Sequence, residues 1–342
     1  MRRRRKRKLR PLRLLLVIAV VALVAAGLCY AGGLLFGGED VPASTEPVPV
    51  EPQAPALPDE RIAEDPQLYS ERAYLVRRED GAVLFSRGAD ERMYPASLTK
   101  VMTALVALEQ MAPQESAAAR LRYLLPGYTV PESIFDELYR QSASLAGFVP
   151  GERVSGRDLI AGVLLPSGGD ASLTLAIELM GSEEQFVARM NERAAELGMT
   201  GTHFTNVCGL HDEQHYSTAR DMAVLLDAAL ENEAFREIFQ LREYRVTATD
   251  RRPDGFVLES TLKRGLTTDL FPGGRILGGK TGTTTPAGQC LVSLAEKNGR
   301  EYILVTAGAR PQQEMEELAS GVDARTLYGL IPEQRAEAEA AA

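Results

Sequence analysis

Close to its first residue the chain carries a long apolar run, and this run constrains how everything after it can be organised. Residues 14–36 hold no charged side chain, and these 23 positions exceed the roughly 20 that a helix needs to cross a bilayer. A basic cluster before such a run stays on the cytoplasmic side of a membrane. We therefore predict a basic cytoplasmic segment over 1–13, a transmembrane anchor over 14–36, and a single-pass cell-membrane protein whose remaining part lies outside the cytoplasm. The cluster comprises Arg2, Arg3, Arg4, Arg5, Lys6, Arg7, Lys8, Arg10 and Arg13.

Other interpretations of this N-terminal segment are weaker. A cleaved signal peptide would need a small-x-small site, and Cys29-Tyr30-Ala31 is a poor one. The apolar run also exceeds the usual signal core of about 7–15 residues. Bulky Leu28 argues against lipid attachment at Cys29. Because the basic cluster adjoins a membrane span, where such charge sets topology, we expect no nucleic-acid partner.

Beyond the apolar run the chain is acidic. Nine of its 38 basic residues precede residue 14, which leaves 29 against 47 acidic residues and a formal charge of about −18 for the rest. Such a surface is not suited to binding anionic polymers, so individual cations carry more meaning than the average. Arginine supplies nearly all of them, whereas lysine can lose its proton near neutral pH and is a candidate for proton transfer. The four lysines of this part are Lys100, Lys263, Lys280 and Lys297.

The composition divides the exported part into a linker, a domain and a tail. Residues 37–60 are rich in Pro, Glu, Ala and Val, which predicts an extended linker. One folded domain is expected over 61–330 and a disordered tail over 331–342. The domain contains Cys208 and Cys290. A disulfide between them is possible in an oxidising compartment, but two buried free thiols are favoured.

The first two thirds of the domain are predicted to be mainly helical after one hairpin. Apolar segments on both sides of Asp80-Gly81 predict that hairpin. A second, small hairpin is expected where residues 144–149 reach the turn at Pro150-Gly151. Helices are then predicted over 157–165, stopped by Pro166, over about 171–181, from a capping box of Ser182 and Gln185, and over about 218–232, capped by Thr218 and Asp221.

The last third turns to short strands joined by tight turns. We predict an antiparallel meander through 244–246, 256–258, 276–283, 290–294 and 302–306, covered by a helix over 313–327. The fold class is therefore α+β, with an antiparallel β-sheet flanked by helices and a helical subdomain. We expect the catalytic site in a cleft between the sheet and the helical subdomain.

One predicted helix carries candidate chemistry at its start. Pro95 and Ala96 lead into an apolar run without Gly or Pro, so Ser97 should lie at or near a helix N-terminus. Positions i and i+3 share one helix face, so the Ser97 hydroxyl and the Lys100 amine can meet. A neighbouring lysine can make a serine nucleophilic without histidine, and the positive end of the helix dipole favours the alkoxide.

The Ser-x-x-Lys pattern is weak evidence alone, because the chain carries a second copy at Ser260 and Lys263. That copy runs straight into Arg264-Gly265 and no apolar helical run follows it. We therefore assign the chemistry to the first copy.

Three histidines lie close together in the chain, at His203, His211 and His215. The last two have i, i+4 spacing, but Gly209 argues for a loop and no fixed carboxylate ligand accompanies them. We therefore favour local hydrogen bonding over a metal site.

Three motifs stand in order along the domain: Ser97-x-x-Lys100, Ser167-Gly168-Gly169 and Lys280-Thr281-Gly282-Thr283. Such a set is typical of penicillin-binding proteins and class A β-lactamases. Over about residues 65–328 the sequence resembles the D-alanyl-D-alanine carboxypeptidases, the low-molecular-mass penicillin-binding proteins of bacterial cell walls. The stretches 202–212 and 216–222 look like that family's own signature. The resemblance implies a β-lactamase/transpeptidase-like fold and calls for no cofactor and no metal.

By this resemblance the chain would remove the terminal D-alanine from peptidoglycan stem peptides through an acyl-enzyme, and would bind β-lactam antibiotics. Ser97 would be the nucleophile, Lys100 its base and Ser167 the proton relay to the leaving amine. As the base, Lys100 must be neutral near pH 7, which requires burial and a neighbouring cation to lower its pKa. Lys280 is the obvious cation.

The third motif would bind the substrate. The resemblance implies that the backbone N–H groups of Ser97 and Thr283 form the oxyanion hole. Thr281 and Lys280 would hold the terminal carboxylate of the peptide. Lys263 or Arg264 would at most assist in this binding.

One departure from the family pattern concerns the second motif, which normally ends in asparagine and here ends in Gly169. Water or another residue must fill the space, and a penicillin-binding or peptidoglycan-binding protein with little or no turnover is the alternative function. A β-lactamase is less favoured, because no Glu-x-x-Leu-Asn stretch lies between Ser167 and Lys280.

Overall fold

The structure is a computed structural model that describes residues 59–312 and 315–333. The predicted cytoplasmic segment and anchor lie outside these residues, as do the linker up to residue 58 and the tail from residue 334. Within the described part, no helix is both long and apolar enough to cross a bilayer. The membrane anchor over 14–36 therefore stays a prediction.

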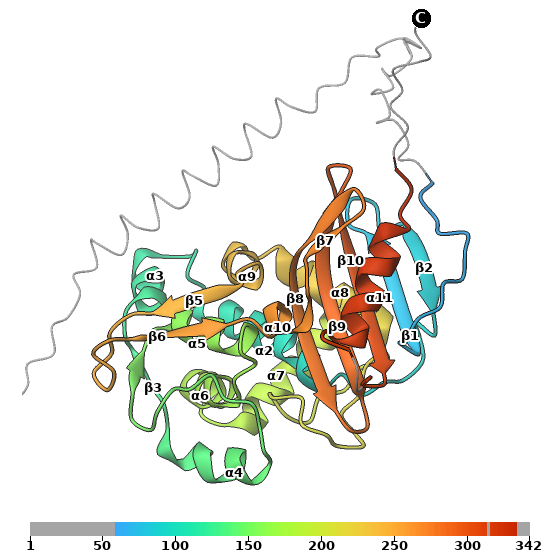
Figure 1. The fold of residues 1–342 in the computed structure, drawn as a ribbon. Helices are drawn as coiled ribbons and strands as arrows, with labels where there is room; N and C mark the ends of the chain where they lie inside the picture. Colours follow the sequence, from blue (N-terminus) through green and yellow to red (C-terminus); the bar gives the residue numbers. More distant parts are fainter. Residues whose placement is uncertain (1–58, 313–314, 334–342) are drawn as a thin grey trace, which may run out of the picture. The chain divides into compact units, whose positions relative to one another are not determined.

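A six-stranded antiparallel sheet carries the strand that bears the third motif (Figure 1). Its strands lie in the order β2-β1-β10-β9-β8-β7. The hairpin predicted at Asp80-Gly81 is confirmed, and Gly81 takes a φ of +70°, which glycine adopts without strain. The strands are β1 (Arg72–Arg77), β2 (Val83–Arg87), β7 (Leu270–Phe271), β8 (Gly274–Thr284), β9 (Gly288–Lys297) and β10 (Arg300–Ala309).

Helices cover both faces of this sheet, because side chains alternate across its central strands and both sets are apolar. On one face the strands pack against α8 (Ala219–Leu230) and the helices beyond it. On the other face they pack against α11 (Ala319–Gly329). The first face uses Val292, Leu294, Ile303 and Val305, and the second uses Leu291, Ala295, Tyr302 and Leu304.

Helix α2 (Lys100–Met111) runs through the centre of a helical lobe, which we define as α2 to α7 and α9. Nearly all of α2 is buried, because other helices contact it on several sides. The predicted helix that follows the Ser97 motif is thus confirmed. The remaining bounds are η1 (Ala96–Thr99), α3 (Ala117–Leu124), η2 (Glu132–Ile134), α4 (Phe135–Arg140), α5 (Gly156–Leu164), α6 (Gly169–Met180), α7 (Glu183–Glu196), α9 (Glu233–Phe239) and α10 (Thr261–Gly265).

The helix boundaries follow local sequence signals closely. Helix α5 ends before Pro166, and α6 begins two residues earlier than expected and ends at Gly181, which takes a φ of +83°. Ser182 caps α7 by accepting the N–H of Gln185, and Thr218 caps α8 by accepting the N–H of Asp221. Short-range capping thus decided where these helices start and stop.

Three predictions about the fold are wrong. Residues 144–149 form no hairpin; instead β3 (Tyr128–Thr129) pairs with β4 (Arg153–Val154). The strands β5 (Glu243–Val246) and β6 (Phe256–Glu259) form a separate two-stranded sheet rather than extending the meander. The last helix begins at Ala319, because the described residues just before it, 315–318, are bends and irregular backbone. The rest of the predicted α+β architecture is confirmed.

Candidate active site

Ser97 lies in the 3₁₀ turn η1, immediately before α2. Its hydroxyl accepts a hydrogen bond from Lys100 Nζ at 3.3 Å, so the predicted pairing is present. The turn is unusual, because Ala96 has a φ of +47°, a left-handed conformation that non-glycine residues rarely adopt. Strain of this kind persists only where the surroundings fix it.

Two contacts hold this turn. Gly209 has a φ of +76°, and a Cβ atom there would lie 1.8 Å from the Ala96 carbonyl oxygen, so only glycine allows the approach. On the inner side Thr99 Oγ1 donates to the same Ala96 oxygen at 2.8 Å and contacts His215 Nε2 at 2.7 Å. Since the backbone N–H of Thr205 donates to His215 Nδ1, the Nε2 atom carries the proton and donates to Thr99. Burial lowers the pKa of His215 to about 4, so the ring is neutral at pH 7.

Lys100 is the buried partner of Ser97. Only 3% of it is exposed, and Nζ also donates to the Cys208 carbonyl oxygen at 2.6 Å. Burial is the largest cause that lowers the pKa of Lys100, and the negative charge of Asp170 partly opposes it. The structure therefore favours the neutral amine that a general base requires.

Ser167 lies in the tight loop between α5 and α6, with a φ of +68°. The loop is fixed by hydrogen bonds from Gly168 N to Gly162 O and from Gly169 N to Ser144 O. Burial keeps the Ser167 hydroxyl away from solvent, where it accepts a hydrogen bond from Lys280 Nζ at 2.9 Å. The second and third motifs therefore meet directly.

Asp170 explains why residues 144–149 are not a hairpin. Its carboxylate is fully buried and accepts the backbone N–H groups of Ala146, Gly147 and Phe148 at 2.7–3.0 Å. Burial raises the pKa of Asp170, while these N–H groups act in the opposite direction. The segment therefore bonds to a side chain instead of to a neighbouring strand.

Lys280 points from β8 into the same buried region. It is fully buried and also donates to the Thr281 carbonyl oxygen at 2.8 Å. Burial, and then the charge of Lys100, hold the pKa of Lys280 well below its usual value. The charge of Lys100 therefore disfavours a charge on Lys280, whereas burial is the largest cause that lowers the pKa of Lys100 itself. The predicted role of Lys280 in keeping Lys100 neutral stays a prediction.

The rest of the third motif lies against the nucleophile. A Cβ atom on Gly282 would lie 2.8 Å from Ser97 N, so the absence of a side chain lets β8 pack on the turn. Thr281 Oγ1 donates to Thr261 Oγ1 at 2.7 Å, while Thr283 is exposed. The structure thus brings η1, the Ser167 loop and β8 together, as the three motifs predict.

The space opposite Gly169 is already occupied. A Cβ atom at this position would lie 2.7 Å from Leu138 Cδ2, 3.3 Å from Ser144 O and 3.5 Å from Cys208 Sγ. The gap expected from the missing asparagine is therefore filled by an apolar side chain and a thiol. Neither group offers the amide that asparagine would supply.

The second Ser-x-x-Lys copy does not enter the site. Lys263 is about half exposed and pairs with Glu259 at 3.1 Å and Glu243 at 3.5 Å. Arg264 is exposed on the same short helix. Their suggested assistance is not supported by this placement, although Thr261 on the same helix does bond to Thr281.

The remaining histidines and the cysteines have local roles. His203 Nδ1 bonds to the Gln214 carbonyl oxygen, and His211 packs edge-on against Tyr94. Local hydrogen bonding is therefore confirmed for His203 and His215. Cys208 and Cys290 are buried free thiols, as favoured by the sequence.

Sequence reasoning missed several residues that shape the site. These residues hold backbone groups or other side chains in place from distant parts of the chain, so residue type and spacing give little sign of them. A signal existed for Asp170, which directly follows the Ser167 loop, and for Gly209, which belongs to the signature stretch 202–212. No local signal marks the others, which are Leu138, Thr99, Thr261 and the Cys208 carbonyl.

Comparison with known proteins gives a consistent result. A family model described as D-alanyl-D-alanine carboxypeptidase matches residues 59–311. The chain is 33% identical over 247 residues to D-alanyl-D-alanine carboxypeptidase DacF of Bacillus subtilis, across 71% of this chain and 58% of DacF. It is 34% identical over 260 residues to DacC of Escherichia coli, across 75% of this chain and 60% of DacC. The matched region thus spans less than two thirds of the length of these relatives.

Solved structures agree with the predicted fold. The DD-transpeptidase of Streptomyces K15 superposes with a TM-score of 0.67 at 26% identity, and covers 78% of this chain and 98% of its own. Penicillin binding protein 5 of Haemophilus influenzae gives a TM-score of 0.63 at 27% identity, with 78% and 71% covered. The predicted resemblance and fold class are therefore confirmed.

Proposed function

Because this chain belongs to the D-alanyl-D-alanine carboxypeptidase family, we propose that it removes the terminal D-alanine from peptidoglycan stem peptides through an acyl-enzyme on Ser97. The observation that carries the proposal is the contact of Ser97 Oγ with the buried amine of Lys100 at 3.3 Å. This pair supplies a nucleophile and a neutral base without a histidine. The Lys280–Ser167 pair lies in the same buried region and supplies the second proton-carrying hydroxyl.

The acylation step follows from these contacts. Ser97 Oγ attacks the carbonyl carbon between the last two D-alanines, and Lys100 takes the hydroxyl proton. The backbone N–H groups of Ser97 and Thr283 stabilise the oxyanion, and each such donor is worth roughly 3–4 kcal/mol. Ser167 passes a proton to the departing amine, so the C–N bond breaks and D-alanine leaves. Water then cleaves the Ser97 ester.

The terminal carboxylate of the peptide binds at Lys280 and Thr281. Lys280 is fully buried and its pKa is well below the usual value. A substrate carboxylate beside it supplies the opposite charge and raises that pKa again. Substrate binding therefore charges Lys280, and this charge in turn keeps Lys100 neutral for the attack.

A second candidate is a penicillin-binding protein that acylates with little turnover. It is favoured by Gly169, because Leu138 and Cys208 occupy the space that a side chain at this position would need. These groups offer no amide to position substrate or water. The same site would then form the acyl-enzyme and release it slowly.

The N-terminal segment supports a proposal about location. Residues 14–36 with the basic cluster before them would hold the chain in the cell membrane, with the catalytic domain outside the cytoplasm. Protease treatment of intact and opened cells tests this. A domain that is digested only after the cells are opened would contradict it.

The test of the catalytic proposal measures two products on the full chain. Intact mass after mixing with benzylpenicillin reports acylation, and D-alanine release from a D-Ala-D-Ala peptide reports turnover, each beside Ser97→Ala. Because the Streptomyces K15 neighbour is titled a DD-transpeptidase, an amine acceptor is included beside water. An adduct with release supports the carboxypeptidase, and a stable adduct without release supports the second candidate. An adduct that disappears rapidly would indicate a β-lactamase, and no adduct would overturn all three.

A further inference from the structure

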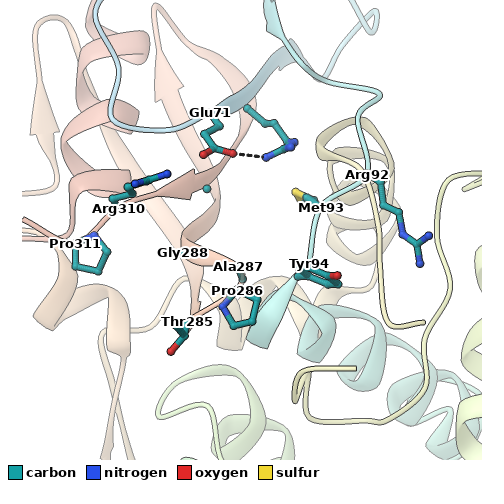
Figure 2. Close-up of a pocket in the computed structure, with 12 residues that line it drawn as sticks. Glu71, Arg92, Met93, Tyr94, Thr285, Pro286, Ala287, Gly288, Arg310 and Pro311 are labelled. Atoms are coloured by element: carbon teal, nitrogen blue, oxygen red, sulfur yellow. Dashed lines mark hydrogen bonds and ion pairs between the residues drawn. The ribbon is translucent and has the colours of Figure 1, made fainter. Parts of the chain in front are cut away.

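A pocket of about 490 Å³ lies where β8 turns into β9 (Figure 2). Its lining comes from the turn at Thr285 to Gly288, from the ends of β1 and β10, and from residues 92–94. Residues 92–94 lead directly into the Ser97 turn, and Thr285 follows the third motif by two positions. Two segments of the pocket lining are therefore close in sequence to motifs of the proposed active site.

The charged lining of this pocket is mainly basic, although the exported part of the chain is acidic. Arg72, Arg92 and Arg310 line it beside a single carboxylate, Glu71. Figure 2 shows Glu71 and Arg310 on one side of the pocket, with Met93 and Tyr94 on the other. An anionic group therefore fits it better than a cationic one.

The three arginines differ in how far they are already engaged. Arg72 pairs with Glu71 at 2.9 Å and Glu91 at 3.4 Å, yet its buried Nε finds no hydrogen-bond partner in the described part of the chain. Arg92 stacks on Tyr216 and donates to a backbone carbonyl. Arg310 is exposed and forms no ion pair with any described residue. Its guanidinium is available for a bidentate contact with a carboxylate.

The direction of the substrate follows from the proposed function, on which this inference rests. If the terminal carboxylate lies at Thr281 and the scissile carbonyl at Thr283, the peptide runs antiparallel to β8. Each earlier stem residue then lies about 3.3 Å further along the strand. The third stem residue, which precedes the two D-alanines, comes level with Thr284 and Thr285. Its side chain is therefore at the rim of the pocket.

We propose that this pocket is a subsite for the third stem residue, and that Arg310 binds a carboxylate at the end of that residue's side chain. A diamino acid with a terminal carboxylate and ammonium satisfies both Arg310 and Glu71. A lysine side chain ends in an ammonium alone and meets three guanidinium groups with one carboxylate. The site thus selects stems that carry the free carboxylate.

The test compares three peptides ending in D-Ala-D-Ala that differ only at the third residue. These carry meso-diaminopimelate, meso-diaminopimelate with its side-chain carboxylate amidated, or L-lysine. The full chain should release D-alanine from the first with a kcat/KM about tenfold above the other two, the usual effect of one charge-assisted contact. Arg310→Gln should lower kcat/KM for the first peptide by about the same factor and remove the preference. Arg275→Gln, an exposed arginine at the far end of β8, is the matched control and should keep it.

The possible outcomes separate this inference from the proposed function. Equal kcat/KM for the three peptides, or a preference that survives Arg310→Gln, overturns the subsite and leaves the function intact. If benzylpenicillin forms an adduct but no peptide releases D-alanine, the three peptides are compared as competitors. Each peptide that binds should then slow the formation of the benzylpenicillin adduct. In that case the diaminopimelate peptide should compete about tenfold better, and equal competition overturns the subsite. If no adduct forms and no peptide releases D-alanine, both proposals are overturned.

Discussion

The chain contains the pattern Ser-x-x-Lys twice, and the two copies have opposite surroundings. At the first copy Lys100 is buried, contacts Ser97 and begins a helix of twelve residues. At the second copy Ser260 caps a helix of five residues, and Lys263 lies half exposed between two glutamates. The pKa of Lys100 is lowered by burial, whereas that of Lys263 is raised, first by its hydrogen bond to Glu259.

The difference shows that spacing brings the serine and the lysine together but does not make them reactive. Reactivity at the first copy needs a neutral amine, which burial supplies, and a fixed hydroxyl, which the strained Ser97 turn supplies. At the second copy Lys263 is half exposed, and the Ser260 hydroxyl caps a helix by accepting the N–H of Leu262. Four experiments test how much of the contrast each structural feature explains.

The largest effect is expected when each lysine is replaced by methionine, which keeps a similar length and cannot accept a proton. Lys100→Met should slow formation of the benzylpenicillin adduct by about a thousandfold, the usual range for a general base. Lys263→Met should leave that rate within about twofold, because Lys263 only forms exposed ion pairs. Intact mass followed over time measures both. Equal losses in the two variants would contradict the assignment of chemistry to the first copy.

The next experiment concerns His215, which supports the Ser97 turn through Thr99 and has no counterpart at Ser260. Burial lowers the pKa of His215 from 6.5 to about 4, so between these pH values the unfolded chain binds more protons than the folded one. The free energy of unfolding is therefore unaffected by this difference above pH 6.5. It falls as the pH decreases to 4, because the unfolded chain then binds a proton at His215 that the folded chain does not. The loss amounts to about 3 kcal/mol.

Urea unfolding of the wild-type chain and of His215→Gln at pH 4 and pH 7 measures this loss. The variant should show a smaller drop between the two pH values, because glutamine does not titrate, while all other groups contribute equally to both chains. The same drop in both chains would show that the buried histidine is not responsible.

The third experiment tests the packing around Gly169. In Gly169→Asn the new Cβ atom would lie 2.7 Å from Leu138 Cδ2, so the variant should lose about 1–3 kcal/mol of unfolding free energy through overpacking. Combining it with Leu138→Ala should cost less than the sum of the two single changes, since the smaller residue makes room. Thermal or urea unfolding of the four chains gives the interaction energy. Strict additivity would mean that Leu138 does not fill the asparagine position.

The smallest effect is expected at the second copy. Ser260 Oγ accepts the N–H of Leu262 and caps α10. Ser260→Ala should therefore lower the free energy of unfolding by about 1 kcal/mol, as for other helix caps, and leave acylation unchanged. A loss of adduct formation in this variant would show that Ser260 takes part in the chemistry.

Much of the candidate site could be predicted from the sequence, because its three motifs are short and their local structure is set by neighbours in the chain. The placement of Ser97 before a helix, the stop at Pro166 and the caps at Ser182 and Thr218 were all predicted and are present. The prediction that the three motifs form one site rested on their agreement with one family. Residue spacing alone does not predict that Lys280 contacts Ser167.

Two of the three failed fold predictions share one cause. Residues 144–149 have a turn signal, yet their backbone N–H groups bond to the buried carboxylate of Asp170, a residue more than 20 positions away. The strands β5 and β6 have the pattern of the main sheet but pair only with each other. Local patterns indicate which segments can form strands, and distant partners decide which strands they pair with.

The sequence by itself therefore determined the local elements, the order of the three motifs and the family, because steric limits, capping and residue chemistry act over a few positions. Only the tertiary structure decided that Lys100 is buried and that Leu138 and Cys208 take the place of the missing asparagine. It also decided that Ala96 is held in a left-handed conformation beside Gly209 and Thr99. These features depend on atoms brought together from distant parts of the chain. Burial of that kind, rather than the pattern, distinguishes Ser97 from Ser260.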